Sequence, residues 1–178
     1  YVRDYKKRFK WIRPTLFKAK LAEDLAHDTL RLTELLRSQG AWDADKDHKW
    51  QALHKLLTQT HGKDKVLIFT QFADTARYLA REARKAGIGH VALATGASAD
   101  PYDIACRFSP KSNNKSVSKA DEVRVLICTD VLSEGQNLQD SNVVVNFDLP
   151  WAIIRLIQRA GRVDRIGQRA EEIHCYSF

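Results

Sequence analysis

The residues best suited to chemistry lie near the end of the chain, in the string QRAGRVDRIGQ. Gln158, Arg162 and Arg165 follow one another at intervals of four and three residues, which places them on one stripe of an α-helix. An arginine guanidinium is planar, permanently charged and able to bind phosphate oxygens in pairs. Two such groups and a carboxamide facing the same way suit a triphosphate better than a neutral ligand. The alternative is a solvated basic helix face, paired with Asp164 or Glu171.

Apolar, β-branched runs indicate the strands that position this helix. Two of them, Val123–Cys128 and Val143–Phe147, come directly before it. Three further strands are predicted at Lys65–Thr70, His90–Ala94 and Ile173–Tyr176. Continuous apolar strands separated by helical crossovers are typical of a parallel sheet that is covered on both faces. The sequence therefore predicts an α/β fold with a mainly parallel sheet and helices on both faces.

Apolar residues at helical spacing predict the helices between and before these strands. The predicted ranges are Leu21–Ser38, Lys49–Thr60, Asp74–Ala86 and Ala99–Phe108. Pro150 stands where a further helix begins, the one predicted to carry the arginines. The first of these ranges makes a helical N-terminal segment ahead of the α/β unit.

Polar residues follow several of the predicted strands, at the edge where parallel sheets bind their ligands. Thr129 and Asp130 come directly after one strand, and Thr95, Gly96 and Ser98 lie in the turn after another. Small hydroxyl residues around a glycine let a backbone approach a phosphate closely and donate N–H bonds to it. An ordinary strand-to-helix turn with a Ser or Asp cap explains the second group equally well.

Three strings of the sequence resemble conserved motifs of superfamily-two helicases. TDVLSEGQNLQ and QRAGRVDRIGQ resemble the fifth and sixth motifs, and VLIFTQF resembles the fourth. The ending RIGQ is similar to that of the Swi/Snf-like branch of ATP-driven DNA translocases, and SEGQNLQ and DLPW are closer to its bacterial members. The resemblance covers about Asp47–Phe178. It implies the second of the two RecA-like lobes of such a motor, with a RecA-like three-layer fold.

The resemblance also implies roles for individual residues. Arg162 and Arg165 match the two arginines of the sixth motif, the second being the arginine finger, and Gln158 matches the leading glutamine. The positions assigned to the nucleotide are Gly135, Asn137 and Asp130, and those that match ones near the nucleic acid are Gln71, Thr129 and the turn Thr95–Ser98.

The motifs that bind ATP and its metal ion are missing from the sequence. It contains no GxxxxGK[ST] loop and no DE-x-H box to hold Mg²⁺. The resemblance therefore implies that ATP with Mg²⁺ is bound mainly by an N-terminal RecA-like lobe of the same protein, and that this fragment alone hydrolyses little or no ATP. Double-stranded DNA is the implied partner. Two alternatives stay open: a non-catalytic nucleic-acid-binding module that kept the fold, and the motor part of a restriction or anti-phage system.

The net charge of +7 is concentrated at the start of the 178-residue chain. Residues 1–20 carry eight basic residues and one acidic residue, so the remainder is neutral. Aromatic residues interleaved with these cations suit nucleic-acid binding, or packing on a preceding domain. We predict a basic arm and helical linker over residues 1–46 and the helicase C-terminal lobe over residues 47–178. Residues 109–121 are almost free of apolar side chains and predict a mobile insertion.

Several classes of protein are disfavoured by the composition. The three cysteines are odd in number and far apart, and the spacing of His48, His54 and His61 matches no common zinc site, so we predict neither disulfides nor a metal site. No apolar run reaches the length of a membrane span, and the start is too basic and aromatic for a signal peptide. A reduced, cytoplasmic chain without a membrane partner is expected. The lack of any methionine suggests an excised fragment.

Overall fold

The computed structural model describes residues 12–40, 42–132 and 136–178. The chain divides into two units, residues 1–43 and 44–178, each of which is described by itself. The first unit contains the 3₁₀ turn η1 (Pro14–Leu16) and the helix α1 (Leu21–Gln39). The predicted helix of this unit is thus confirmed. Most of the basic arm, up to residue 11, lies outside the described residues.

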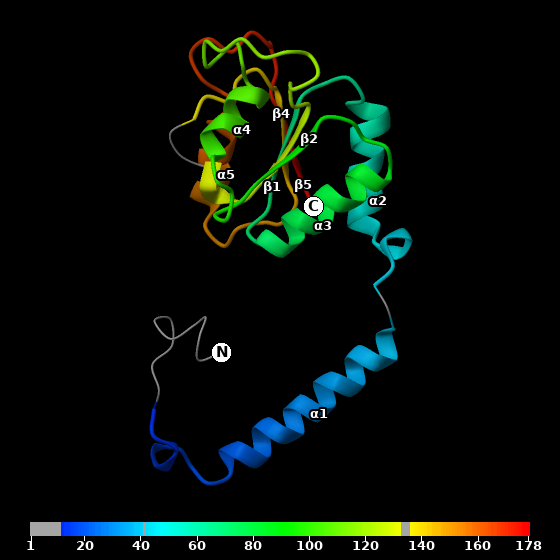
Figure 1. The fold of residues 1–178 in the computed structure, drawn as a ribbon, viewed down its shortest axis with the longest axis vertical. Helices are drawn as coiled ribbons and strands as arrows, with labels where there is room; N and C mark the ends of the chain where they lie inside the picture. Colours follow the sequence, from blue (N-terminus) through cyan, green and yellow to red (C-terminus); the bar gives the residue numbers. More distant parts are fainter. Residues whose placement is uncertain (1–11, 41, 133–135) are drawn as a thin grey trace. The chain divides into compact units, whose positions relative to one another are not determined.

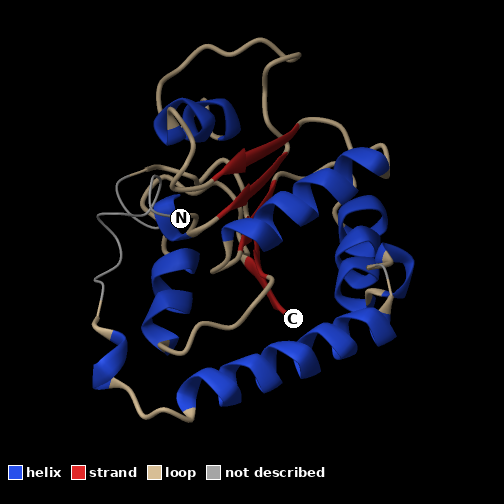
Figure 2. Ribbon diagram, turned by 60° about the horizontal axis from the view of Figure 1, so that its bottom comes forward, coloured by secondary structure: helices blue, strands red, loops and turns tan. Residues whose placement is uncertain are grey.

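The second unit is a five-stranded parallel sheet with helices on both faces (Figures 1 and 2). Its strand order is β2-β3-β1-β4-β5, and every pairing is parallel. The strands are β1 (Val66–Phe69), β2 (Val91–Ala94), β3 (Val125–Cys128), β4 (Val143–Asn146) and β5 (His174–Ser177). The helices are α2 (His48–Lys55), α3 (Ala73–Lys85), α4 (Pro101–Phe108) and α5 (Ile153–Ala160). Short turns of helix are η2 (Ala44–Lys46), η3 (Leu56–Thr60) and η4 (Asp130–Leu132).

This architecture confirms the predicted fold, and all five predicted strands lie within two residues of their expected bounds. Residues 109–121, expected to be an insertion, contain neither helix nor strand. Within the ranges that the structure describes, no helix is long and apolar enough to cross a bilayer.

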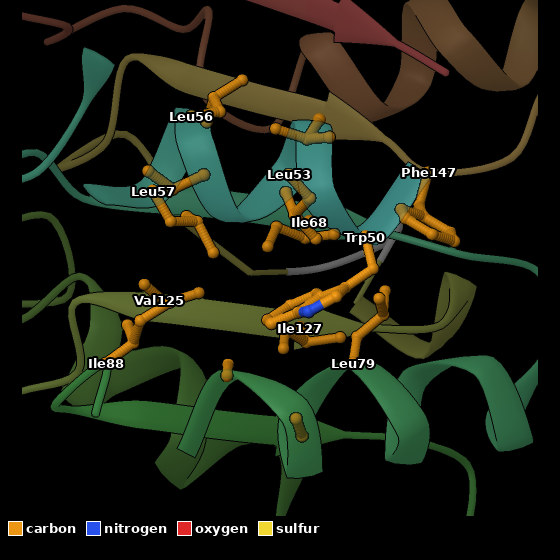
Figure 3. Close-up of a cluster of buried hydrophobic side chains, with 14 of the residues drawn as sticks. Trp50, Leu53, Leu56, Leu57, Ile68, Leu79, Ile88, Val125, Ile127 and Phe147 are labelled. Atoms are coloured by element: carbon orange, nitrogen blue, oxygen red, sulfur yellow. The ribbon is translucent and has the colours of Figure 1, made fainter. Parts of the chain in front are cut away.

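Alternate residues of each central strand supply the two halves of the core. In β1, Ile68 belongs to the cluster that packs against α2 and α3, whereas Leu67 and Phe69 belong to the cluster on the opposite face. Figure 3 shows the first cluster, in which Trp50 and Leu79 lie over the sheet. Because successive side chains of a strand point to opposite faces, the continuous apolar runs of the sequence fill both layers at once.

The helix predicted over Lys49–Thr60 changes its winding part of the way along. Residues His48–Lys55 are α-helical, and Leu56–Thr60 form a π-helical turn in which the His61 N–H bonds to the Leu56 carbonyl at 2.8 Å. The guanidinium of Arg124 donates to the His61 carbonyl at 3.1 Å, which satisfies an oxygen at the end of this helix.

The helix predicted to carry the arginines is shorter than expected, and this prediction was wrong. α5 begins three residues after Pro150 and ends at Ala160, with Gly161 at its C-cap. Arg162 and Arg165 therefore lie in the turns beyond the helix and not on one helical stripe with Gln158.

Two features end the helix at this point. Gly161, at the C-cap, has a low helix propensity, roughly 1 kcal/mol less favourable than alanine inside a helix. Val163 is completely buried in the second core cluster, so the chain must turn inward just after the glycine. The i, i+4, i+7 spacing of the polar residues cannot reveal this inward turn.

The core of the sheet makes a stability prediction. Ile68→Ala removes a completely buried side chain from β1, so we expect the free energy of unfolding to fall by about 2–5 kcal/mol. Ile166→Ala is the matched control, because Ile166 is fully exposed and its loss should cost under about 0.5 kcal/mol. Urea unfolding followed by tryptophan fluorescence measures both, since Trp50 is buried in the same core. Equal losses in the two variants would contradict the packing described here.

Candidate functional site

Three neighbouring strands end at the same level and bring the predicted nucleic-acid residues to one edge of the sheet. The last residues of β2, β3 and β1 are in register, and the next residue of each chain segment continues the ladder. The Thr129 N–H donates to the Ala94 carbonyl at 3.0 Å, and the Thr70 N–H donates to the Cys128 carbonyl at 3.0 Å. Thr95, Thr129 and Gln71 therefore lie along one carboxyl edge, each following a different strand.

The turn Thr95–Ser98 is closed largely by its own side chains. The Thr95 N–H donates to Ser98 Oγ at 2.9 Å, the Ala97 N–H donates to Thr95 Oγ1 at 3.3 Å, and the Ser98 N–H donates to the Thr95 carbonyl at 2.9 Å. A β-carbon added at Gly96 would meet nothing within 4 Å. Of the four backbone N–H groups, three are thus bonded inside the turn, and Gly96 presents an open backbone surface.

The predicted position Gln71 is held by the loop after β4. Its backbone N–H donates to the Asp148 carboxylate at 2.9 Å, and its Nε2 donates to the Leu149 carbonyl at 3.1 Å. Thr70 Oγ1 also donates to Asp148. This carboxylate therefore joins the ends of β1 and β4 at the edge where the candidate site lies.

Arg159 anchors α5 at the same edge. This buried arginine was not among the residues predicted from the sequence. Arg159 has no exposed surface, and its Nε donates to Asp130 Oδ1 at 2.9 Å. Its Nη1 donates to Asn146 Oδ1 at 3.0 Å, and its guanidinium lies 5.1 Å from the centre of the Phe69 ring. The available signal was an acidic residue directly after a buried strand, because such a carboxylate needs a cationic partner.

Asp130, predicted to face the nucleotide, is engaged by two arginines of α5. Arg155 Nη1 donates to its second oxygen at 2.8 Å, and Arg159 Nε to its first at 2.9 Å. Burial raises the pKa of the adjacent Cys128 thiol, so this thiol is neutral at physiological pH. Asp130 is therefore the acidic group that balances the charge of Arg159.

The two predicted arginines and the predicted asparagine are brought together beyond α5. Arg165 Nη1 donates to Asn137 Oδ1 at 2.9 Å, and the Leu138 N–H donates to the Arg162 carbonyl at 3.3 Å. Gln168 Nε2 donates to the Ser141 carbonyl at 2.9 Å, which fixes the end of the same turn. The string GRVDRIGQ is thus bound along its length to the segment after β3.

Two predicted positions are not part of this group. Gln158 lies on the last turn of α5 and is exposed. Gly135 lies outside the described residues.

Comparisons with known proteins match the fold and the strings of the sequence. Residues 48–167 match the family described as helicase conserved C-terminal domain. An uncharacterized ATP-dependent helicase YqhH of Bacillus subtilis (strain 168) is 36% identical over 115 residues, which are 65% of this chain and 19% of that protein. RNA polymerase-associated protein RapA of Vibrio vulnificus (strain YJ016) is 36% identical over 135 residues, which are 75% of this chain and 13% of that protein. The chain therefore spans less than a fifth of the length of these relatives.

Among solved structures, the C-terminal part of the Fun30 ATPase domain has the same fold. It matches with a TM-score of 0.61 and 20% sequence identity, over 86% of this chain and 48% of that chain.

The buried arginine makes a second stability prediction, in which the net charge is kept. Arg159→Lys loses the fork that bonds Asp130 and Asn146 together, so we expect a loss of about 1–3 kcal/mol in the free energy of unfolding. Arg155→Lys is the matched control: it lies on the same helix and pairs with the same carboxylate, but half of its side chain is exposed. Its expected loss is under about 1 kcal/mol. Urea unfolding of both variants measures the difference, and similar losses would show that burial of Arg159 is unimportant.

Proposed function

The chain belongs to the helicase conserved C-terminal domain family, and on that premise we propose that it is the second motor lobe of an ATP-dependent translocase of double-stranded DNA. In this proposal the intact protein hydrolyses ATP, and the chain closes the nucleotide site of an N-terminal RecA-like lobe. The observation that carries the proposal is the turn after α5, where Arg162 and Arg165 are both bound to the segment that begins at Asn137.

The donors of this turn fit a nucleotide triphosphate. When bound with Mg²⁺, ATP supplies the phosphoanhydride bond whose hydrolysis drives such motors. Arg165 is exposed, and it carries five N–H donors, of which one is bonded to Asn137. Its remaining donors suit phosphate oxygens and the charge that develops on them.

The proposal divides the work between two lobes. This sequence has no phosphate-binding loop and no acidic box for Mg²⁺, so the first lobe holds the triphosphate and the metal. The residues of this chain add positive charge from the opposite side. Alone, the chain hydrolyses little or no ATP.

In the same proposal, the DNA backbone lies against the carboxyl edge of β2, β3 and β1. The open surface at Gly96 allows close approach of a phosphate, and the hydroxyl of Thr129 lies on the neighbouring strand end. Gln71 completes the row. Such contacts to phosphates fix the position of the duplex without reading its sequence.

The proposed arginine finger is tested in the full-length protein. Arg165→Ala should lower DNA-stimulated ATP turnover by roughly 10³–10⁵, because the guanidinium acts on charge that develops in the transition state. The melting temperature and the affinity for DNA should stay nearly unchanged, since Arg165 is exposed. Arg77→Ala is the control, an exposed arginine of α3 that pairs with Asp74. A preserved turnover in Arg165→Ala would rule out the motor role of this turn.

The contribution of the basic arm to DNA binding is tested by its salt dependence. We expect the full-length protein to bind duplexes without sequence preference, and Lys6, Lys7 and Lys10 changed together to glutamine should flatten the plot of log affinity against log salt. The slope should change by up to about 3, because each lost phosphate contact removes about 0.9. The control changes three lysines of the 109–121 segment instead: Lys111, Lys115 and Lys119. If only the control flattens the slope, the arm does not contact DNA.

A further inference from the structure

The proposed finger Arg165 lies on a turn, so its direction depends on what it contacts. Beyond α5 the backbone continues in turns, in which the Arg165 N–H donates to the Val163 carbonyl at 3.2 Å and the Arg165 carbonyl accepts the Gln168 N–H at 2.9 Å, so the backbone is held while the side chain projects from a turn. Its Nη1 donates to Asn137 Oδ1 at 2.9 Å, a contact that spans 28 residues of sequence. Whatever orients the side chain of Asn137 therefore also orients the guanidinium.

Asn137 is oriented in turn by the segment 109–114. Its Nδ2 donates to the Ser112 carbonyl at 3.3 Å, so its oxygen faces the opposite way, toward Arg165. Asn113 uses both N–H groups of its side chain, one on the Asn137 carbonyl at 2.8 Å and one on the Ser109 carbonyl at 2.7 Å. A carbonyl needs a donor and a guanidinium needs an acceptor, so the two partners of the Asn137 amide require the same orientation.

The segment 109–114 is itself fastened to the sheet. The carboxylate of Asp140 accepts the backbone N–H of Lys111 at 2.8 Å and that of Ser112 at 3.0 Å, together with the Ser112 hydroxyl. Ser109 is completely buried, and its Oγ accepts the Asp140 N–H at 3.4 Å. Asp140 lies just before β4, so the segment has a fixed anchor close to Asn137.

We infer that Asn113 and Asn137 are positioning residues for Arg165, and that the segment 109–114 is part of the catalytic apparatus. This inference rests on the proposed function. Asn113 holds the backbone of Asn137 in place, the Ser112 carbonyl orients its amide, and the amide oxygen holds the guanidinium. The sequence had assigned this segment to a solvated insertion and Asn137 to the nucleotide. The hydrogen bonds instead indicate that the segment 109–114 and Asn137 both act by holding the Arg165 guanidinium in place.

The test measures steady-state ATP hydrolysis by the full-length protein with DNA in excess. Asn113→Ala should lower kcat by roughly 10–10² and change the KM for ATP by less than about threefold, because misplacing a catalytic group affects the transition state more than binding. Asn142→Ala is the matched control: its Nδ2 also donates to a distant backbone carbonyl, that of Glu172, at 3.3 Å, but it contacts no part of the finger network. We expect its kcat to equal that of the unchanged protein.

A double-mutant cycle separates positioning from a general structural effect. Single-turnover reactions with enzyme in excess keep the slow hydrolysis of Arg165→Ala measurable. In that background Asn113→Ala should cause no further loss, since a residue that acts only through Arg165 has nothing left to position. Losses that multiply in the double variant would overturn the inference. If Asn113→Ala does not fold, Asn137→Ala replaces it in the same cycle, because it removes the amide oxygen that accepts from Arg165.

The outcomes distinguish this inference from the proposed function. If Arg165→Ala keeps its turnover, the proposed function is wrong, and the positioning role that rests on it is wrong as well. If Arg165→Ala is slow while both asparagine variants turn over at the normal rate, the motor role stands and the positioning role is wrong.

Discussion

The position of the candidate site depends on one buried charge. The side chain of Arg159, on α5, contacts the ends of three central strands. It lies over Phe69 of β1 and donates hydrogen bonds to Asp130, after β3, and to Asn146 of β4. A guanidinium must point its Nε and Nη1 in fixed directions, so this contact sets both the rotation and the height of the helix. An apolar contact alone is non-directional and leaves both less defined.

α5 shows the consequence of this arrangement on its outer surface. Ile153, Ile154 and Ile157 are all more than half exposed, while the charged Arg159 is inside. The helix is thus held to the sheet by a polar clamp where an ordinary surface helix would use its apolar face. Burying a charge costs free energy because the charge loses its hydration. We interpret the clamp as fixing a specific geometry, namely the point at which the chain leaves the helix toward Arg162 and Arg165.

The fold could be predicted from the sequence because its strongest signals are local. Runs such as VLIF and VVVN are buried on both faces, and they predict strands without knowledge of their neighbours. The family resemblance, which rests on short contiguous strings such as QRAGRVDRIGQ, is also confirmed. The end of α5 could not be predicted in this way, because it depends on Val163 entering a core built from distant segments. Arg159 was missed for a similar reason, since charge on a helix normally indicates solvent.

The segment 109–114 shows a limit of composition as a guide. Ser, Asn and Lys in succession predict a solvated loop, because such side chains cannot bury enough apolar surface to offset their ordering. The same groups satisfy each other here, with Asp140 accepting backbone N–H groups and Asn113 donating to two carbonyls. Polar residues that bond to one another and polar residues that bond to water have the same composition. Only the position of Asp140, 28 residues away from Ser112, separates the two cases.

Placing Arg165 on a turn has a physical consequence for how the motifs work. A side chain on a helix inherits its direction from the helical backbone, whereas one on a turn takes it from its hydrogen-bond partners. For Arg165 that partner is Asn137, which belongs to the string resembling the fifth motif. The Leu138 N–H bonds to the Arg162 carbonyl, so the backbones of the two strings are joined as well. The strings that resemble the fifth and sixth motifs are therefore joined in this chain by both a side-chain and a backbone hydrogen bond.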